Sequence, residues 1–147
     1  MWWRNRDVGH GEPKKRALAR RVRAGRHTGL VAYEDAEAVG WVSIAPREEY
    51  PALLRSPQYR PRDTTDDNVW SIVCFVVDRE ARGRGITPEL LEAAVAHAYR
   101  NGATVVEAYA HNAKSDDYMG WRDLYAAHGF ELVRAASKRS IMQRRCG

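Results

Sequence analysis

The residues with the clearest chemical potential form a short turn of glycines and arginines: Arg82, Gly83, Arg84, Gly85, Ile86 and Thr87. The turn follows the most apolar run of the chain, residues 69–77, and precedes a helical pattern. Its two glycines allow the backbone to bend and to approach a ligand without a Cβ in the way. The first amides of a helix have no partner within the helix, and its dipole attracts anions. The turn therefore predicts an anion-binding cradle, to which the two arginines add positive charge.

The start of the helix after this turn fits the same interpretation. Thr87 can cap a helix, and Pro88 suits its first position. The spacing is neither a Walker loop nor a dinucleotide fingerprint, because Ile86, Thr87 and Pro88 follow the second glycine. Two glycines between a strand and a helix are also common in plain tight connections with solvated arginines. From spacing alone, a phosphate site and a simple turn remain equal alternatives.

The cysteines and histidines do not indicate a metal centre or a disulfide framework. Cys74 lies within the apolar run, which favours a core residue over a nucleophile. Cys146 is next to last, so a disulfide framework is not predicted. The five histidines are scattered, and with two cysteines they show no metal-ligand spacing. We therefore predict no structural metal.

Size and charge define the class of molecule. A chain of 147 residues suits one domain, residues 1–147. The net charge of +5 and the pI of about 9.5 favour anionic partners, or serve only solubility. No apolar run approaches the roughly 20 residues that span a bilayer, and the first residues lack the pattern of a signal peptide. We therefore predict a cytoplasmic protein that does not engage membranes.

The elements that must position the cradle alternate between strands and helices. Strands are predicted at residues 27–33, 38–45, 69–77, 104–110, 130–133 and 139–143, and helices at 13–24, 88–101 and 120–128. The run 69–77 is rich in β-branched residues, which is typical of a central strand buried on both faces. The strand–helix–strand order around the cradle predicts parallel pairing there. The sum is an α/β sandwich with a strand–helix–strand unit at its centre.

The turn resembles the cofactor motif of the GNAT superfamily of acyl-CoA N-acetyltransferases, written Arg/Gln-x-x-Gly-x-Gly/Ala. Arg82, Gly85 and Thr87 occupy its three defined places, although Thr87 departs from the usual Gly or Ala. That departure implies a slightly different backbone approach to the phosphates. The later signatures of the family match in order: Leu90, Leu91, Gly102, Ala103, Leu124, Tyr125, Gly129 and Phe130. The resemblance covers about residues 69–144, and before them only the general helix–strand–strand pattern agrees.

The resemblance implies a three-layer sandwich whose splayed, mostly antiparallel sheet has a central parallel pair. It also implies acetyl-CoA as co-substrate, with no metal. The pantetheine arm would pair with the backbone of Phe75, Val76 and Val77, and Asn112 would orient that arm. Amides of residues 84–87 would hold the pyrophosphate. The acceptor amine would then attack the thioester directly, with no covalent enzyme intermediate.

The resemblance also suggests the residues that transfer protons. Tyr125 is the predicted acid for the leaving thiolate, because similar enzymes place a tyrosine in the same Leu-Tyr context. Glu107 lies where the branch that acetylates ribosomal proteins carries a glutamate base. A glutamate on a strand is as often a structural partner for an arginine, so both roles stay open. His111 is a further candidate base, or an exposed loop residue.

The acceptor is expected to be a primary amine on a small molecule or peptide. Its predicted pocket is walled by the connection 47–68 and by Tyr109, Tyr118 and Trp121. Acidic residues that could receive a cationic amine are Glu48, Glu49, Asp66 and Asp67. Two alternatives stay open. The first is an acetyltransferase of aminoacyl-tRNA, which the basic residues of the first helix would suit; nucleic acid is a less favoured partner than a small molecule or peptide. The second is a non-catalytic CoA-binding module that keeps the cradle but has lost turnover.

The start of the chain departs from the family. Its members usually begin with an additional strand and helix, whereas the pattern of this chain matches the family from the second helix onward. An edge strand could therefore be missing, or covered by Trp2 and Trp3. A partner chain, as in a homodimer, is the third option.

Overall fold

The computed structural model describes residue 4 and residues 8–61, 68–114 and 118–147. The helices of these residues are α1 (Glu12–Arg23), α2 (Pro51–Arg55), α3 (Ile86–Arg100) and α4 (Arg122–Ala127). The strands are β1 (Leu30–Glu34), β2 (Glu37–Pro46), β3 (Val69–Val77), β4 (Val105–His111), β5 (Glu131–Ala135) and β6 (Arg139–Arg145). Short 3-10 helices follow β2 and β3: η1 (Arg47–Glu49) and η2 (Arg79–Ala81).

Within the described residues, the strands form one sheet in the order β1-β2-β3-β4-β6-β5. β3 and β4 are parallel, and every other neighbouring pair is antiparallel. The parallel pair is joined through α3, because parallel strands need a crossover connection. The predicted fold class, a mixed α/β sandwich with a central parallel pair, is confirmed.

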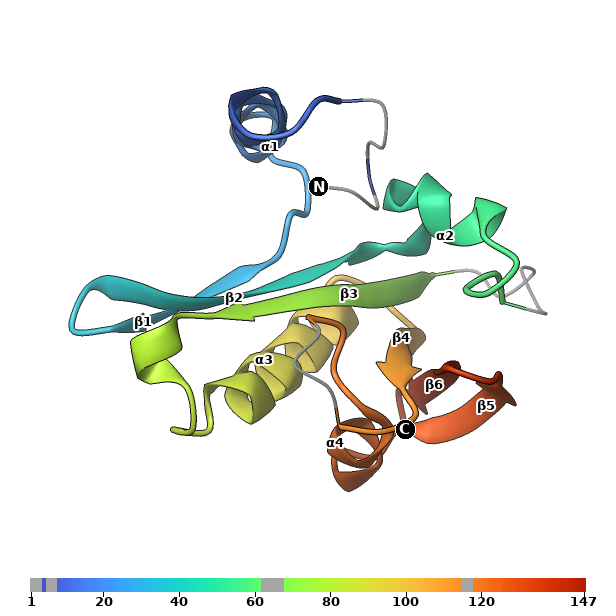
Figure 1. Cartoon of the computed structure of the whole chain (residues 1–147). Coiled ribbons are helices and arrows are strands. Elements are labelled where there is room, and N and C mark those ends of the chain that lie inside the picture. Colours follow the sequence, from blue (N-terminus) through green and yellow to red (C-terminus); the bar gives the residue numbers. More distant parts are fainter. Residues whose placement is uncertain (1–3, 5–7, 62–67, 115–117) are drawn as a thin grey trace.

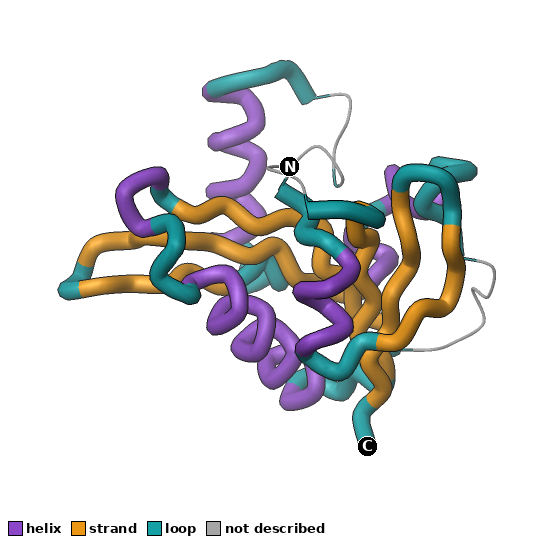
Figure 2. The backbone as a smooth tube through the Cα atoms, turned by 60° about the horizontal axis from the view of Figure 1, so that its bottom comes forward, coloured by secondary structure: helices purple, strands orange, loops and turns teal. Residues whose placement is uncertain are grey.

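Helices cover both faces of the sheet, so the molecule has three layers (Figure 1). α3 and α4 lie on one face, and α1 and α2 on the other; Figure 2 looks from the side of α3 and α4. The larger core lies between α3 and the sheet, where Leu91 and Ala94 are fully buried among Val42, Ile44 and Val106. A smaller core lies on the α2 face and contains Tyr50, Leu53, Val73, Tyr109 and Ile141. The sheet is therefore apolar on both sides at its centre, as the run 69–77 predicted.

The parallel pair diverges before either strand ends. β3 and β4 pair from Val69 with Val105 to Ile72 with Ala108. β3 continues beyond this point to Val77, and β4 to His111. The carboxyl-terminal halves of the two strands thus form the two sides of a V-shaped opening in the sheet. The sheet is therefore splayed, as the resemblance to the GNAT family implied.

The start of α3 corrects the sequence prediction. The helix begins at Ile86 with Gly85 as its N-cap, so Thr87 lies inside the first turn and does not cap. The buried side chain of Ile86 explains the early start, because it packs over Gly40 on β2. A Cβ at Gly40 would lie 3.0 Å from Ile86 Cγ2 and 3.1 Å from Leu90 Cδ1. The missing side chain on β2 lets the first turn of the helix sit close to the sheet.

The start of α4 is a second correction. Sequence reasoning predicts a helix from residue 120, but α4 begins at Arg122 and Trp121 is extended. Trp121 forms an isolated parallel bridge with His111, at the end of β4. The residues just before α4 therefore pair as a strand, because the diverging edge of β4 offers them hydrogen-bonding partners.

The hairpin of β1 and β2 forms one edge of the sheet. Its two-residue turn, Asp35 and Ala36, has positive φ at both positions (45° and 69°), the geometry that matches strand twist. No strand of the described residues pairs with the outer edge of β1. The predicted cover of this edge by Trp2 and Trp3 falls on residues outside the described part of the chain.

Candidate active site

The glycine turn has the conformation of an anion cradle. Gly83 and Gly85 have φ of 77° and 81°, in the left-handed region that favours glycine. A Cβ at either position would meet nothing within 4 Å, so the space above the turn is open to a ligand. α3 begins directly after Gly85, so its first amides face away from the helix without internal partners. The backbone here fits a pyrophosphate.

The side chains of the cradle are already engaged. Arg82 donates from Nε to the carbonyl oxygen of Val77 (3.3 Å). Arg84 donates to Glu34 Oε2 (2.8 Å) and to the carbonyl oxygen of Glu80 (2.9 Å), so it bridges the β1–β2 hairpin and η2. Because these contacts are exposed, each contributes little to stability, and a bound anion can compete for the guanidinium groups.

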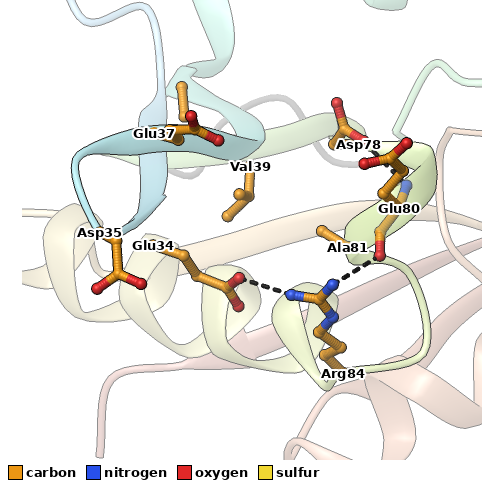
Figure 3. A pocket seen from close by; sticks show the side chains of 9 residues that line it. Glu34, Asp35, Glu37, Val39, Asp78, Glu80, Ala81 and Arg84 are labelled. Carbon is orange, nitrogen blue, oxygen red and sulfur yellow. Dashed lines mark hydrogen bonds and ion pairs between the residues drawn. The ribbon is translucent and has the colours of Figure 1, made fainter.

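Arg84 faces an acidic cavity of about 430 Å³ beside the cradle (Figure 3). The carboxylates that line it belong to Glu34, Asp35, Glu37, Asp78 and Glu80. Asp78 also caps η2, since its Oδ1 accepts the amide of Glu80 (2.9 Å). The charges beside the cradle are therefore of both signs, with Arg84 as the single cation among the residues that line this cavity.

An apolar cavity of about 470 Å³ adjoins the acidic one and shares Ala38, Val39 and Asp78 with it. It lies between α1 and the sheet, with Val22 and Val76 among its lining residues. Sequence reasoning placed the acceptor pocket elsewhere, near the connection 47–68, and did not predict this cavity. An exposed valine on a short helix gives no signal until the sheet that it faces is known.

The predicted cofactor strand is accessible only in part. Phe75 is buried, Val77 is half-buried and Val76 is exposed. The amide of Phe75, which points into the V-shaped opening, donates to the carbonyl oxygen of Tyr118 (2.6 Å). The pairing predicted for a cofactor arm is thus made, at Phe75, by the chain itself.

Tyr125 lies at the base of the opening, on the α3 face. It is completely buried, 6.5 Å from the ring of Phe75 and 5.2 Å from that of Phe130 between centroids. Its hydroxyl donates to the carbonyl oxygen of Met119 (2.7 Å). Burial, and secondarily the neighbouring Cys74, raises the pKa of Tyr125 well above its ordinary value. The phenol therefore keeps its proton at neutral pH.

Glu107 lies on the opposite face, within a polar network enclosed by the smaller core. It is completely buried, and accepts from the Tyr109 hydroxyl (2.6 Å) and from Gln143 Nε2 (2.6 Å). Arg47, itself 7% exposed, places Nη1 3.6 Å from the carboxylate. Burial, followed by the charge of Glu107, raises the pKa of Tyr109 well above its ordinary value. The alternative role given to Glu107, a structural partner of an arginine, is the one that these contacts describe.

The remaining predicted residues are distributed around the opening. The side chain of Asn112 donates to the carbonyl oxygens of Ala136 (2.7 Å) and Ser137 (3.2 Å), and accepts from the Ser140 hydroxyl (2.6 Å). It therefore links the end of β4 to the β5–β6 turn.

Tyr109 has no exposed surface, so the prediction that it walls an open acceptor pocket is wrong.

The acidic residues proposed to receive the acceptor amine have different outcomes. Glu49 pairs with Arg21 of α1 and with Arg26 (2.7 Å). Glu48 is exposed. Asp66 and Asp67 lie outside the described residues. The basic face of α1 is thus partly neutralised by Glu49 of η1.

Sequence reasoning missed a second buried network. Arg4 is 5% exposed and donates to Ser43 Oγ (3.1 Å), Tyr50 Oη (2.9 Å) and the carbonyl oxygen of His27 (3.0 Å). Burial, the largest effect, lowers the pKa of Arg4 and raises that of Tyr50 to about 12. An arginine near a chain terminus gives no sign of burial, because its partners lie far along the sequence.

Comparison with protein families decides the assignment. The family model described as "Acetyltransferase (GNAT) family" matches residues 1–130. The chain belongs to the GNAT acetyltransferase family. The match extends the resemblance noted for the second half of the chain to its start. A search of curated protein sequences finds no match.

Solved structures of GNAT acetyltransferases share the fold. A ribosomal-protein-alanine N-acetyltransferase from Brucella melitensis has a TM-score of 0.64 and 20% identity, over 99% of this chain and 83% of that one. The PaiA N-acetyltransferase from Thermoplasma acidophilum, solved in complex with coenzyme A, has a TM-score of 0.62 and 14% identity, over 99% and 85%. At these identities the likeness concerns the fold.

None of the described helices is long and apolar enough to cross a bilayer.

Proposed function

We propose that this GNAT protein transfers an acetyl group from acetyl-CoA to a primary amine of a small molecule or peptide. The observation that carries the proposal is the continuity of the site. The half of β3 that extends beyond its pairing with β4 leads directly through η2 into a positive-φ glycine turn at the start of a long helix. A backbone edge and an anion cradle in that order suit a cofactor with an amide-bearing arm and a pyrophosphate.

In this proposal the backbone of Phe75, Val76 and Val77 binds the arm. The amides of residues 84–87 hold the pyrophosphate, with Arg82 and Arg84 at its rim. Tyr125 supplies a proton to the leaving thiolate, which its place beside Phe75 supports. The acetyl group passes in one step from sulfur to the amine nitrogen, which loses a proton.

The base is the less defined part of the mechanism. Tyr125 belongs to the larger core, whereas Glu107 contacts Tyr109 of the smaller core, so the two residues lie on opposite faces of the sheet. Glu107 is fully engaged by Tyr109, Gln143 and Arg47. We propose that Glu107 acts on the amine through an intervening water rather than by direct contact.

A test of the proposal begins with cofactor binding. Calorimetry with coenzyme A and with acetyl-CoA is expected to show one site per chain. Transfer is then measured with a panel of aminoglycosides, polyamines, amino acids and peptides, by release of the free thiol. Peptide amino termini belong in the panel because the Brucella melitensis relative is named for a protein alanine. Absence of coenzyme A binding at low salt would contradict the proposal.

A non-catalytic CoA-binding module remains the second candidate, and the contacts of Glu107 favour it. A base held by three side chains is poorly placed to accept a substrate proton. Binding of acetyl-CoA without transfer to any amine of the panel would support this alternative. The aminoacyl-tRNA hypothesis predicts RNA binding that weakens steeply with salt. No RNA affinity at low salt would remove it.

A further inference from the structure

Four residues before α4, Tyr118 to Trp121, lie between the diverging ends of β3 and β4. We call them the inner segment. Met119 and Gly120 are buried, whereas the side chain of Tyr118 is 58% exposed. The segment is therefore not a surface loop. Its backbone fills part of the V-shaped opening in which the proposed function places the cofactor arm.

The inner segment makes backbone hydrogen bonds with both sides of the opening. On the β3 side, the carbonyl oxygen of Tyr118 accepts from the amide of Phe75 (2.6 Å). On the β4 side, the carbonyl oxygen of Gly120 accepts from the amide of His111 (2.9 Å), next to the parallel bridge of His111 with Trp121. The segment thus behaves as a short strand inserted where β3 and β4 separate, and it satisfies edge amides that would otherwise lack partners.

A third contact holds the segment from below. The Tyr125 hydroxyl donates to the carbonyl oxygen of Met119 (2.7 Å). Gly120 has φ of 78°, and a Cβ there would lie 3.0 Å from Tyr125 Cε2 and 3.1 Å from its hydroxyl oxygen. Only glycine combines this backbone angle with this close approach to the ring. The segment is therefore fitted to its place by side-chain as well as backbone contacts.

We infer that the inner segment and the acyl-CoA arm compete for the same edge of β3, so that cofactor binding requires the segment to leave the opening. This inference rests on the proposed function, which places the arm along Phe75 to Val77. One amide cannot serve two acceptors at full strength, and the Phe75 amide already has one at 2.6 Å. The segment is an internal competitor built into the fold.

Competition makes the apparent affinity for coenzyme A depend on how firmly the segment is seated. The measured dissociation constant equals the intrinsic constant divided by the fraction of molecules whose opening is free. Weakening the seat raises that fraction and tightens coenzyme A binding. A residue that merely supported the fold would have the opposite effect or none.

The test compares two glycine substitutions, Gly120→Ala and Gly102→Ala. Both place alanine at positive φ (78° and 89°), but a Cβ at Gly102 meets nothing within 4 Å. Gly120→Ala is expected to tighten coenzyme A binding several-fold in calorimetry, and Gly102→Ala to leave it unchanged. Should Gly120→Ala fail to fold, Tyr125→Phe removes the hydrogen bond to Met119 and is expected to tighten binding in the same direction.

Hydrogen exchange supplies a second measurement on the unmodified protein. Saturation with coenzyme A is expected to speed exchange of the His111 amide, which loses Gly120 as its acceptor. The Phe75 amide should stay protected, because the arm replaces Tyr118. Coenzyme A binding that leaves the His111 amide protected, with equal affinity in both glycine variants, would overturn the inference alone. No binding in any variant would overturn the proposed function, and the inference with it.

Discussion

At the residue scale, Tyr125 has one hydroxyl and two proposed tasks. In the free protein it donates to Met119, and in the proposed reaction it donates to the leaving thiolate. The two tasks exclude each other in time, because a phenol has a single proton to donate. Departure of the inner segment would free that proton at the moment when the cofactor arrives. Binding and acid catalysis are then linked through one side chain.

Tyr125→Phe is predicted to lower turnover about 10²-fold without weakening coenzyme A binding. The ring keeps its packing against Phe130, so the variant loses the hydroxyl, which is both the proton donor and the partner of Met119. Steady-state rates and calorimetry measure the two effects separately. Tyr99→Phe is the matched control, since that tyrosine donates to the carbonyl oxygen of Arg144 (3.0 Å), outside the opening. Equal turnover in both variants would remove Tyr125 from the chemistry.

The ion pair of Glu107 and Arg47 yields a prediction about stability. Glu107→Gln is expected to lower the free energy of unfolding by about 3–5 kcal/mol, because it leaves the Arg47 guanidinium buried without a counter-charge. Urea denaturation measures the change. Adding Arg47→Met should restore part of the loss, and Glu48→Gln, at an exposed neighbour, should change stability by less than about 0.5 kcal/mol. A loss as small in Glu107→Gln as in Glu48→Gln would contradict the structural role.

At the scale of elements, the features that could be predicted correctly are those that depend on the local pattern of the sequence. β3 was predictable because a nearly continuous apolar run rich in β-branched residues suits a central strand, and the structure has that strand at Val69–Val77. The cradle was predictable because its two glycines lie between that strand and a helix. The inner segment was not, since its partners Phe75 and His111 are chosen by the divergence of two strands. Arg47 and Glu107 meet only once the sheet has formed, and local sequence carries no trace of their contact.

The packing of α3 against the start of β3 predicts a dependence of stability on pH. His97 of α3 packs against Trp70 and His27, with ring centroids 5.7 Å and 5.6 Å away. Burial, and then the charges of His27 and Arg100, lowers the pKa of His97 below its ordinary value of 6.5. As the pH falls through 6.5, the unfolded state therefore binds more protons than the folded state, so stability decreases towards acid pH.

The measurement is denaturation at a series of pH values. His97→Gln should flatten the decline in the free energy of unfolding between 6.5 and the lower pKa of the folded state. His10→Gln, at an exposed position, serves as the control and should leave the slope unchanged. The same slope in all three proteins would show that His97 does not contribute to it.

At the scale of the whole molecule, the charge distribution matters more than its sum. The chain carries a net charge of +5, yet the cavity beside the cradle is lined by five carboxylates and one arginine. A CoA pyrophosphate approaching the cradle would therefore meet an attractive helix start and a repulsive wall. Arg84 stands between them, because it is paired with Glu34 while it borders the cradle (Figure 3).

This position predicts that Glu34 limits the affinity for coenzyme A. Glu34→Gln removes one negative charge and releases Arg84, so binding should tighten several-fold at low ionic strength. Glu37→Gln removes a charge from the same cavity but leaves the ion pair of Arg84 with Glu34 intact, so its effect should be smaller. Raising the salt concentration should reduce the difference between the two variants, because exposed charges are screened beyond about 8–10 Å at ordinary ionic strength. Equal affinities of Glu34→Gln and the unmodified protein at low salt would mean that Arg84 takes no part in holding the phosphates, and that the backbone amides of the turn carry the anion alone.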